Sequence, residues 1–570
     1  MSKKEIIKGF RLAATLMELH QENPFKIRGY QNAIAALERA EIADDDLTAA
    51  SLIASGLTDN MAGKALSLLR SGTFQELEEL KAKTPPGVIE MLSIKGLGAK
   101  KVQAIWQELG ITTLYELAEA CQAGKIATLK GFGEKTQARI LEQIAFLQSN
   151  QGKILYAEAE TLAAHLLKAV QEKVAPLKAE LTGQVARCWE VIDCLQVTAA
   201  VSNVELAFEN WVHNNPLVET DLVACSPFVW RGWLLDPHNA HRLIAAQIHW
   251  TSLENFPVVT LKNTASPLHL SALGFLELIK KQTAFESVES IYQALGVPFV
   301  PAELREGSFE VLLAKQQSLP TLVTWNDLKG TLHNHSTYSD GKDSLRQMAQ
   351  AAHLMGLQYF GIADHSVSAY YANGLTIEQI KQQHREIDQL NRELAPFRIL
   401  KGIEADILAD GSLDYPEEIL ATFDYVVASV HSGLKMDISK ATQRLIKAIE
   451  NPYTTILGHP TGRLLLRREG YPIDYEAVIS ACAAHQVAIE INANPWRLDL
   501  DWRWVRRAIE AGCLLCINPD AHETEGLYHM RYGLLMARKG GAESRHILNA
   551  FSLEQLQDWL SRRKRIGQKG

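Results

Sequence analysis

The sequence lacks three features that would assign it to a simple class. It has no uninterrupted apolar run approaching the ~20 residues that a membrane helix needs. Its seven cysteines are odd in number and scattered between Cys121 and Cys516, so they form no disulfide framework. The start MSKKEIIKGFRLAATLMELH is charged every few residues and lacks the apolar core of a secretory signal. These absences predict a protein of a reducing, cytoplasmic compartment without a membrane anchor.

An excess of positive charge is also missing. The 58 Lys and Arg residues stand against 66 Asp and Glu residues, which gives a net charge of −8. No global field therefore holds the protein on DNA, and any nucleic-acid contact must be local. What is present is ordinary globular composition, 47% hydrophobic and 22% charged. A length of 570 residues fits about four domain-sized units.

The hydrophobic pattern changes twice along the chain. Residues 1–150 show apolar spacing of three and four, which predicts an all-α region. Residues 151–320 mix helical and strand-like segments, with predicted strands at Val191–Val201 and Phe256–Leu261. From 328 to 570, short apolar runs alternate with helical segments. This alternation predicts repeated βα units that form a parallel sheet or barrel.

Potential metal ligands follow the strand-like runs of the last third. They are His333, His335, Asp340, His365, Glu404, His431, His459, Asp520 and His522. Residues two apart on a strand share a face, so His333 with His335 and Asp520 with His522 can each direct two groups at one point. Active sites of βα barrels lie at the carboxyl ends of the strands. We therefore expect these side chains to converge.

Six imidazoles and three carboxylates exceed one tetrahedral site. They suit two or three ions, with Glu404 placed to bridge two of them. Mixed imidazole and carboxylate ligands favour Zn, Mn or Fe over Mg or Ca. Such a cluster lowers the pKa of bound water and stabilises a leaving oxygen. The sequence thus predicts hydrolysis of a phosphate ester.

Two segments of the helical region resemble each other, LSIKGLGAKKVQAIWQELG and ATLKGFGEKTQARILEQI. Each has a glycine hairpin before a helix, which exposes backbone N–H groups to a phosphate. Residues 91–140 carry seven Lys and Arg against four Glu. The predicted DNA contacts are Gly96, Gly98, Lys100, Lys101, Gly131, Gly133 and Lys135. These contacts position a DNA backbone without reading its sequence.

The motifs HNHSTYSDG, ADHS, GIEADIL, SVHSG, GHPTGR, EINANPWRLDL and NPDAH resemble the polymerase-and-histidinol-phosphatase (PHP) domain of bacterial family X DNA polymerases (PolX). All nine metal positions of that family are occupied here. The resemblance implies a distorted (βα)₇ barrel with three metal ions, usually Mn or Zn, and a 3′–5′ exonuclease. The glycine segments resemble helix-hairpin-helix motifs, and ASGLTDNMAGKA lies where the family has its first hairpin, as a degenerate copy.

The resemblance extends to the whole chain and divides it into four predicted parts. These are a helical DNA-binding domain at 1–85, a fingers-like helix-hairpin-helix domain at 86–150, a degenerate palm and thumb of α+β type at 151–320, and the PHP domain at 328–570. Beside the metal ligands, the predicted substrate contacts are Arg463, Arg497, Asn373 and Asn494. The two arginines are the predicted phosphate ligands, because a guanidinium offers two donors.

The middle region departs from the family pattern. Two-metal nucleotidyl transfer needs carboxylates to hold both ions. Aligned on the family, Cys194 and Gln196 occupy the positions of its two aspartates, and Asp193 is off by one residue. No Asp occurs between Asp236 and Asp327 to supply the third. The sequence therefore predicts no polymerase activity.

The pattern as a whole predicts a metal-dependent phosphoesterase that acts on DNA 3′ ends, gapped or single-stranded, in DNA repair. Three alternatives stay open. The first is a phosphatase of small phosphomonoesters, and the first 150 residues argue against it because such enzymes need no DNA-binding hairpins. The second is an active PolX polymerase. The third is a DNA-binding scaffold that works with repair proteins.

Overall fold

The computed structural model describes residues 3–40, 42, 44–213, 215–236 and 239–567. The chain divides into two compact units, Met1–Gln151 and Gly152–Gly570. The finer boundaries predicted near residues 85 and 320 stay a prediction. Within the described ranges, no helix combines the length and the apolar character needed to cross a membrane.

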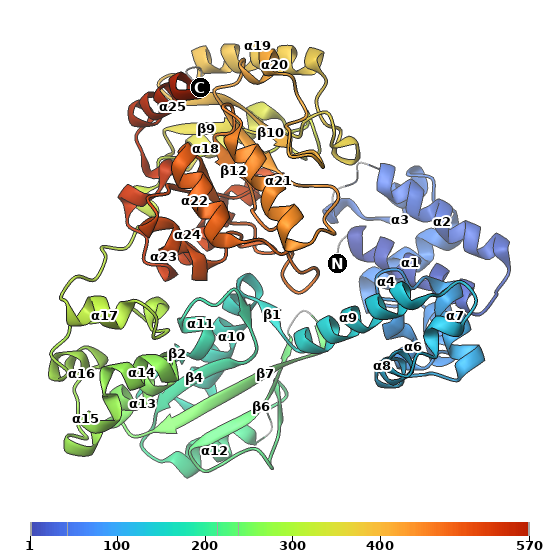
Figure 1. Cartoon of the computed structure of the whole chain (residues 1–570). Helices are drawn as coiled ribbons and strands as arrows, with labels where there is room; N and C mark the ends of the chain where they lie inside the picture. Colours follow the sequence, from blue (N-terminus) through green and yellow to red (C-terminus); the bar gives the residue numbers. More distant parts are fainter. Residues whose placement is uncertain (1–2, 41, 43, 214, 237–238, 568–570) are drawn as a thin grey trace. The chain divides into compact units, whose positions relative to one another are not determined.

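The first unit is all-α, as predicted. Its helices are α1 (Lys3–Leu19), α2 (Pro24–Arg39), α3 (Ala49–Ala54), α4 (Asp59–Ser71), α5 (Gln75–Ala82), α6 (Pro86–Met91), α7 (Ala99–Leu109), α8 (Leu114–Gln122) and α9 (Glu134–Asn150). Helix α1 buries an apolar stripe, including Phe10 and Leu16, against its neighbours. In Figure 1, α9 is the long helix that ends the first unit.

The second unit begins with an α+β region built on one five-stranded sheet in the order β2-β4-β7-β6-β5. The elements are β1 (Ile154–Leu155), α10 (Tyr156–Val174), β2 (Lys178–Thr182), α11 (Gly183–Ala186), β3 (Val191–Ile192), β4 (Leu195–Ala200), α12 (Val204–Val212), β5 (Val218–Thr220), β6 (Val229–Asp236) and β7 (Asn239–Thr251). Trp211, Trp230 and Ile248 lie in the core beneath the sheet.

Helices follow this sheet. They are α13 (Phe256–Thr264), α14 (Pro267–Leu273), α15 (Phe275–Lys281), α16 (Val288–Ala294) and α17 (Glu310–Lys315), and they enclose a small core around Phe275 and Tyr292. The strand predicted at Phe256–Leu261 is wrong, because this segment is the start of α13. Phe256, Thr260 and Thr264 recur at the four-residue spacing of one buried helix face, and Pro257 suits the first turn.

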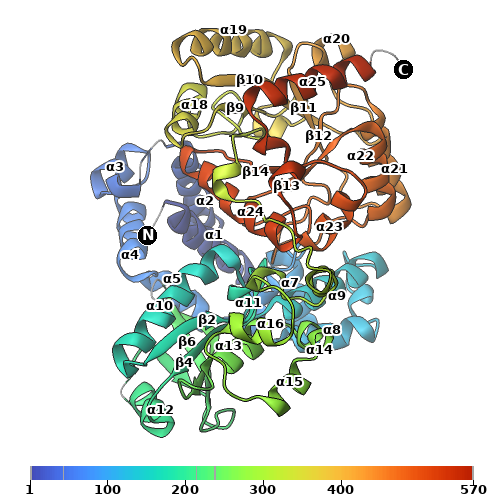
Figure 2. The same cartoon turned by 90° about the vertical axis from the view of Figure 1, so that its left-hand side faces the viewer.

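The rest of the unit is a barrel of seven parallel strands, each followed by at least one helix. The elements are β8 (Gly330–Thr331), α18 (Leu345–Leu354), β9 (Tyr359–Ile362), α19 (Ile377–Glu393), β10 (Arg398–Asp406), α20 (Glu417–Leu420), β11 (Tyr425–Ser429), α21 (Ile438–Glu450), β12 (Ile456–Leu457), α22 (Tyr475–His485), β13 (Ala488–Asn492), α23 (Trp502–Glu510), β14 (Leu515–Asn518), α24 (Met530–Lys539) and α25 (Leu553–Gly567). Figure 2 shows the helices outside the strands. This confirms the predicted (βα)₇ fold.

The strands run in the order β14-β13-β12-β11-β10-β9-β8, so β8 and β14 are the two ends that must meet. They meet just beyond their last residues, where the N–H of Asp520 donates to His333 O and the N–H of His335 donates to Ala521 O. Leu556 and Leu560 of α25 pack with Tyr359, Tyr425 and other inward side chains near the starts of the strands. The barrel interior is therefore a packed core, and its opposite end is left for chemistry.

Candidate metal centre

The nine predicted donors gather at one end of the barrel. His333, His335 and Asp340 follow β8, His365 follows β9, Glu404 lies on β10, His431 follows β11, His459 follows β12, and Asp520 and His522 follow β14. Parallel strands place their carboxyl ends at the same rim, so donors far apart in the sequence share one site. The local backbone contributes, since Asp520 adopts a positive φ of 52° that turns the chain back after β14.

Eight donors form three groups whose ligand atoms lie within 4.8 Å of one another, among the residues described. The groups are His335 with Asp340, His365 and His522; His333 with His335 and Asp520; and His365 with Glu404 and His431. His335 and His365 each belong to two groups, so the three groups are continuous. The ninth donor, His459, has Nε2 3.0 Å from Glu404 Oε1.

Glu404 lies at the centre of the site, with 1% of its side chain exposed. Its Oε1 is 3.1 Å from His431 Nε2 and 3.3 Å from His333 Nε2. Its Oε2 is 3.0 Å from His365 Nδ1. Both carboxylate oxygens therefore face imidazole nitrogens of different strands, which is the position of a bridging ligand.

Several of these buried donor atoms have no hydrogen-bond partner within the described part of the chain. They are His333 Nε2, His335 Nδ1, His365 Nδ1, His459 Nδ1 and Glu404 Oε2. Buried polar atoms are normally hydrogen-bonded. Five unpartnered donor atoms in one cluster therefore indicate that the site binds a further group. Divalent cations fit, because the orphaned atoms are imidazole and carboxylate donors of the kind that bind Zn, Mn or Fe.

The electrostatics of the site are those of a coupled His and carboxylate cluster. Burial alone would raise the pKa of Glu404, but His431, His333 and His365 hold it well below its ordinary value. Burial opposes a charge on His431, yet Glu404 and Asp406 raise its pKa to about 10. Burial and the neighbouring His522 and His365 lower the pKa of His335 to about 3. The arrangement keeps the carboxylates ionised, as cation binding requires.

Two carboxylates that the sequence analysis did not include contact the donors from behind. Asp406 is hydrogen-bonded to His431 Nδ1, and Glu490 lies with Oε1 2.7 Å from His333 Nδ1. A sequence signal existed for Asp406, since it stands two residues after Glu404 on the same strand face. Glu490 lies on β13, the strand that supplies none of the nine donors. It is the first residue of the motif EINANPWRLDL, which was the available signal, but the motif alone does not indicate a contact with His333.

Only one of the two predicted phosphate-binding arginines reaches the cluster. Arg497 places Nε 3.4 Å from Asp520 Oδ2. Arg463 instead donates to Asp501 Oδ2 at 2.5 Å and to the carbonyl of Arg497 at 2.8 Å, so its guanidinium supports the loop that carries Arg497. Asn373 is exposed in the left-handed region, with φ of 54°. The side chain of Asn494 accepts from the N–H of Trp496.

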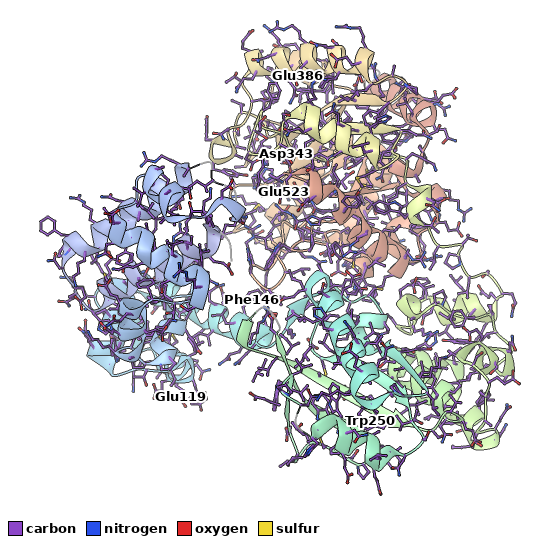
Figure 3. All side chains as sticks on the ribbon, turned by 180° about the vertical axis from the view of Figure 1, so that it is seen from behind. Glu119, Phe146, Trp250, Asp343, Glu386 and Glu523 are labelled. Atoms are coloured by element: carbon purple, nitrogen blue, oxygen red, sulfur yellow. The ribbon has the colours of Figure 1, made fainter. Side chains whose placement is uncertain are left out.

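The loops at this rim are tied to one another. The N–H of Thr524 donates to Asp343 at 2.7 Å, and Lys342 is paired with Glu523. Figure 3 shows Asp343 and Glu523 close together, with Glu386 of α19 farther away at the top of the view. Glu386 accepts a hydrogen bond from the hydroxyl of Tyr338 at 2.8 Å. The loops after β8 and β14 are therefore held in place around the donors.

The predicted hairpins form in the first unit. Gly96 and Gly131 have φ of 98° and 85°, which only glycine adopts without strain, and Gly98 and Gly133 cap α7 and α9. The degenerate copy takes the same form, with Gly56 at φ 101° and Thr58 capping α4. The degenerate copy, which comes first along the chain, therefore has the same hairpin geometry with Thr in place of the capping glycine.

The outer face of the two glycine-rich hairpins is open. Among the described residues, no atom lies within 4 Å of where a side chain at Gly98, Gly131 or Gly133 would begin. At Gly98 and Gly133, whose φ values any residue can adopt, neither packing nor backbone conformation requires glycine, whereas close approach by another backbone would. Lys100 and Lys135 are exposed, and Lys101 lies over the Phe132 ring at 5.4 Å, which joins the two hairpins.

Two neighbouring strands of the middle sheet, β4 and β7, carry no acidic residue. Their register pairs Gln196 with Gln247. Asp193 lies just before β4, exposed, and its carboxylate accepts from Gln184 Nε2 at 3.1 Å. A pair of carboxylates that could hold two ions is therefore absent from these two strands.

Comparison with known proteins agrees with this geometry. A family model described as "PHP domain" matches residues 331–494, and one described as "SAM-like Helix-hairpin-helix tandem" matches residues 88–145. The Bacillus subtilis (strain 168) protein named "DNA polymerase/3'-5' exonuclease PolX" is 34% identical over 576 residues, which cover 99% of this chain and 100% of the relative. A protein of Thermoanaerobacter sp. (strain X514) named "Probable phosphatase" is 28% identical over 251 residues, which cover 41% of this chain and 94% of the relative.

The barrel and its buried donor clusters therefore define a PHP domain, the fold of a class of metal-dependent phosphoesterases. The helix-hairpin-helix tandem and the match along nearly the whole length then assign the rest of the chain to a family. The chain belongs to the bacterial PolX family.

Proposed function

We propose that this protein is a metal-dependent phosphoesterase that removes nucleotides from the 3′ ends of DNA. The observation that carries the proposal is the set of three continuous donor groups at the open end of the barrel. The PolX name of the full-length relative includes a 3′–5′ exonuclease. An isolated structural histidine pairs with one partner, whereas five of these nine residues carry a buried donor atom without a hydrogen-bond partner among the described residues.

The nine donors would hold two or three divalent ions, Mn or Zn by the chemistry of the ligands. When bound, such ions activate water at neutral pH and stabilise the charge on the leaving oxygen. The chain itself supplies the rest. Arg497 lies beside Asp520 and would bind a phosphate oxygen of the substrate, while Arg463 holds the Arg497 loop. Asn373 and Asn494 would contact the sugar or base.

The helix-hairpin-helix motifs would hold the DNA. Their open glycines expose backbone N–H groups at helix starts, and exposed lysines add cationic donors. Binding by phosphate contacts alone is independent of sequence, as end processing in DNA repair needs. We include in this proposal a cytoplasmic location and gapped or single-stranded 3′ ends as substrates.

The test is degradation of a 3′-labelled oligonucleotide in the presence of Mn²⁺. We expect His333→Ala combined with Asp520→Ala to abolish the activity, because the double variant removes two donors of one group. His353→Ala is the matched control, since His353 is exposed on α18 away from the donor groups. Unchanged degradation by the double variant would refute the assignment.

A second candidate is hydrolysis of small phosphomonoesters. It is favoured by the protein of Thermoanaerobacter sp. named a probable phosphatase, which matches 41% of this chain over 94% of its own length. The hairpins argue for DNA, since a small substrate needs no such surface. Turnover of a small aryl phosphate that exceeds turnover of DNA would favour the phosphatase.

We also propose that the middle region does not polymerise DNA. Gln196 and Gln247 occupy adjacent strand positions where two ions would need carboxylates. Primer extension on gapped DNA is the test, and template-dependent incorporation would overturn the proposal. DNA affinity in a purified protein that binds no metal would instead favour the role of a repair scaffold.

A further inference from the structure

Glu490 is a fully buried carboxylate beneath the metal centre, and no donor group includes it. Its carboxylate accepts hydrogen bonds from four groups. Its Oε1 faces His333 Nδ1 at 2.7 Å and Asn518 Nδ2 at 3.0 Å. Its Oε2 faces the backbone N–H of His459 at 2.8 Å and Asn492 Nδ2 at 3.2 Å. Both oxygens are thus fully used, which the burial of a charge requires.

These contacts reach three of the nine donors. His333 is contacted through its ring and His459 through its backbone N–H. The third donor, Asp520, is reached through Asn492, whose Nδ2 also donates to Asp520 Oδ2 at 3.1 Å. The three donors follow β8, β12 and β14. One side chain of β13 therefore fixes donors contributed by three other strands.

The contact with His333 also decides which nitrogen of that ring is available. An ionised carboxylate only accepts hydrogen bonds, so the proton of a neutral His333 must lie on Nδ1. The lone pair is then on Nε2, which faces Glu404 Oε1 at 3.3 Å and Asp520 Oδ1 at 3.8 Å. Nε2 is buried and has no hydrogen-bond partner among the described residues. The ring is thus held ready to bind a cation through Nε2.

A second buried pair in the chain shows what a structural Glu–His contact looks like. His269 Nδ1 lies 2.7 Å from Glu310 Oε1, the same distance as in the His333–Glu490 pair, and both side chains are fully buried. There, however, His269 Nε2 is hydrogen-bonded to the hydroxyl of Tyr292 at 2.8 Å. The two pairs differ at Nε2 of the histidine. In His269 this nitrogen is hydrogen-bonded to Tyr292, whereas in His333 it faces the donor cluster.

We propose that Glu490 is a positioning residue of the metal centre, which selects the Nε2 donor of His333 and fixes the places of His459 and Asp520. The inference rests on the metal-dependent function proposed above. Glu490 is not itself a ligand. Its role is to orient three ligands from behind, and removal of such a partner weakens metal binding by roughly 10–100-fold in metalloproteins.

The experiment measures Mn²⁺ affinity by isothermal titration of the full-length, metal-stripped protein, together with its thermal unfolding. Glu490→Gln keeps the size of the side chain but places an N–H₂ group where His333 or His459 must donate. We expect this variant to bind Mn²⁺ 10–100-fold more weakly than wild type. Glu310→Gln is the matched control. It removes the other buried Glu–His pair, and we expect it to lower the unfolding temperature with Mn²⁺ affinity unchanged.

Glu490→Asp serves if Glu490→Gln does not fold, since it keeps the charge but withdraws the carboxylate from His333. It should also weaken Mn²⁺ binding. Wild-type affinity in a folded Glu490 variant would overturn this inference alone. Failure of the wild-type protein to bind Mn²⁺ would overturn the proposed metal centre and this inference with it. Equal losses of affinity in the Glu490 and Glu310 variants would reduce Glu490 to a stabilising role.

Discussion

Arg497 places a positive charge beside the donors, with its Nε 3.4 Å from Asp520 Oδ2. A hydrogen bond to a charged group contributes about 1.5–3 kcal/mol, which corresponds to roughly 10–150-fold in rate. We therefore expect Arg497→Ala to lower kcat/KM for a 3′-labelled oligonucleotide by about that factor. The measurement is steady-state degradation with Mn²⁺.

Arg545→Ala is a suitable control for this experiment, because Arg545 is exposed and pairs only locally with Glu543. We expect it to degrade DNA at the wild-type rate. An Arg497 variant as active as this control would exclude a phosphate contact at position 497.

At the scale of single residues, the sequence predicts the nine metal donors but not the side chains that fix their positions. His333, Glu404 and Asp520 stand at the ends of recognisable apolar strands, so the barrel rule alone predicts that they meet. The Glu490–His333 contact joins a residue in the middle of β13 to one just after β8, 157 positions apart, and no periodicity in the sequence indicates such a contact. For Arg463, the predicted phosphate contact stays a prediction. Its guanidinium donates to Asp501 and to the carbonyl of Arg497, which belong to a loop whose path the sequence does not specify.

Among the structural elements, the two glycine-rich hairpins carry the predicted DNA affinity. Lys100 and Lys135 stand just after the hairpin glycines, and both are exposed. We expect Lys100→Ala combined with Lys135→Ala to weaken DNA binding and to reduce the slope of log K against log salt by about 2. Fluorescence anisotropy at several salt concentrations measures both quantities. Lys168→Ala is the control, because Lys168 lies on α10 in the other unit. An unchanged slope in the double variant would contradict the assignment.

Strand β7 supplies a prediction about pH. Burial, with the charges of Arg231 and Lys262, lowers the pKa of His249 from 6.5 to about 4. Between these values the unfolded chain binds a proton that the folded chain does not. The contribution of His249 to the free energy of unfolding is therefore fully present above pH 6.5, and it is lost as the pH falls toward 4.

The measurement is the midpoint of thermal unfolding at pH 7 and at pH 5. We expect His249→Asn to lose less stability between the two values than wild type does, since Asn does not titrate in this range. An identical loss in both proteins would show that His249 titrates freely in the folded state.

The elements themselves were largely predictable. The apolar character of the runs at β9 to β14 predicts strands there, and the two Gly-x-Gly repeats predict the hairpins. The exception is α13, where Pro-Val-Val suggested a strand. Packing decided otherwise, since Phe256, Thr260 and Thr264 lie buried along one helix face.

At the scale of the whole second unit, the polymerase-like region and the barrel share a buried polar contact. Lys539 of α24 is 1% exposed, and its Nζ lies 2.5 Å from Glu306 Oε1 and 2.8 Å from the carbonyl of Arg187. Trp502 covers it with a ring centroid at 4.3 Å. Glu190 adds a parallel contact, since it accepts from Trp502 Nε1 at 2.9 Å.

Removing one partner of a buried ion pair leaves an uncompensated charge, which costs about 3–5 kcal/mol. We expect Glu306→Ala to destabilise the second unit by about that amount in urea unfolding, and Glu306→Ala with Lys539→Met to regain much of it. A Glu306 variant as stable as wild type would show that the contact does not join the two regions.

The account rests on the convergence of nine side chains upon several cations. The most direct measurement is a crystal structure of the full-length protein grown with Mn²⁺, with anomalous scattering recorded near the manganese edge. Two or three anomalous peaks, each within coordination distance of the donor groups around Glu404, are the predicted result. Diffraction that shows these nine side chains well ordered and without an anomalous peak among them would contradict it.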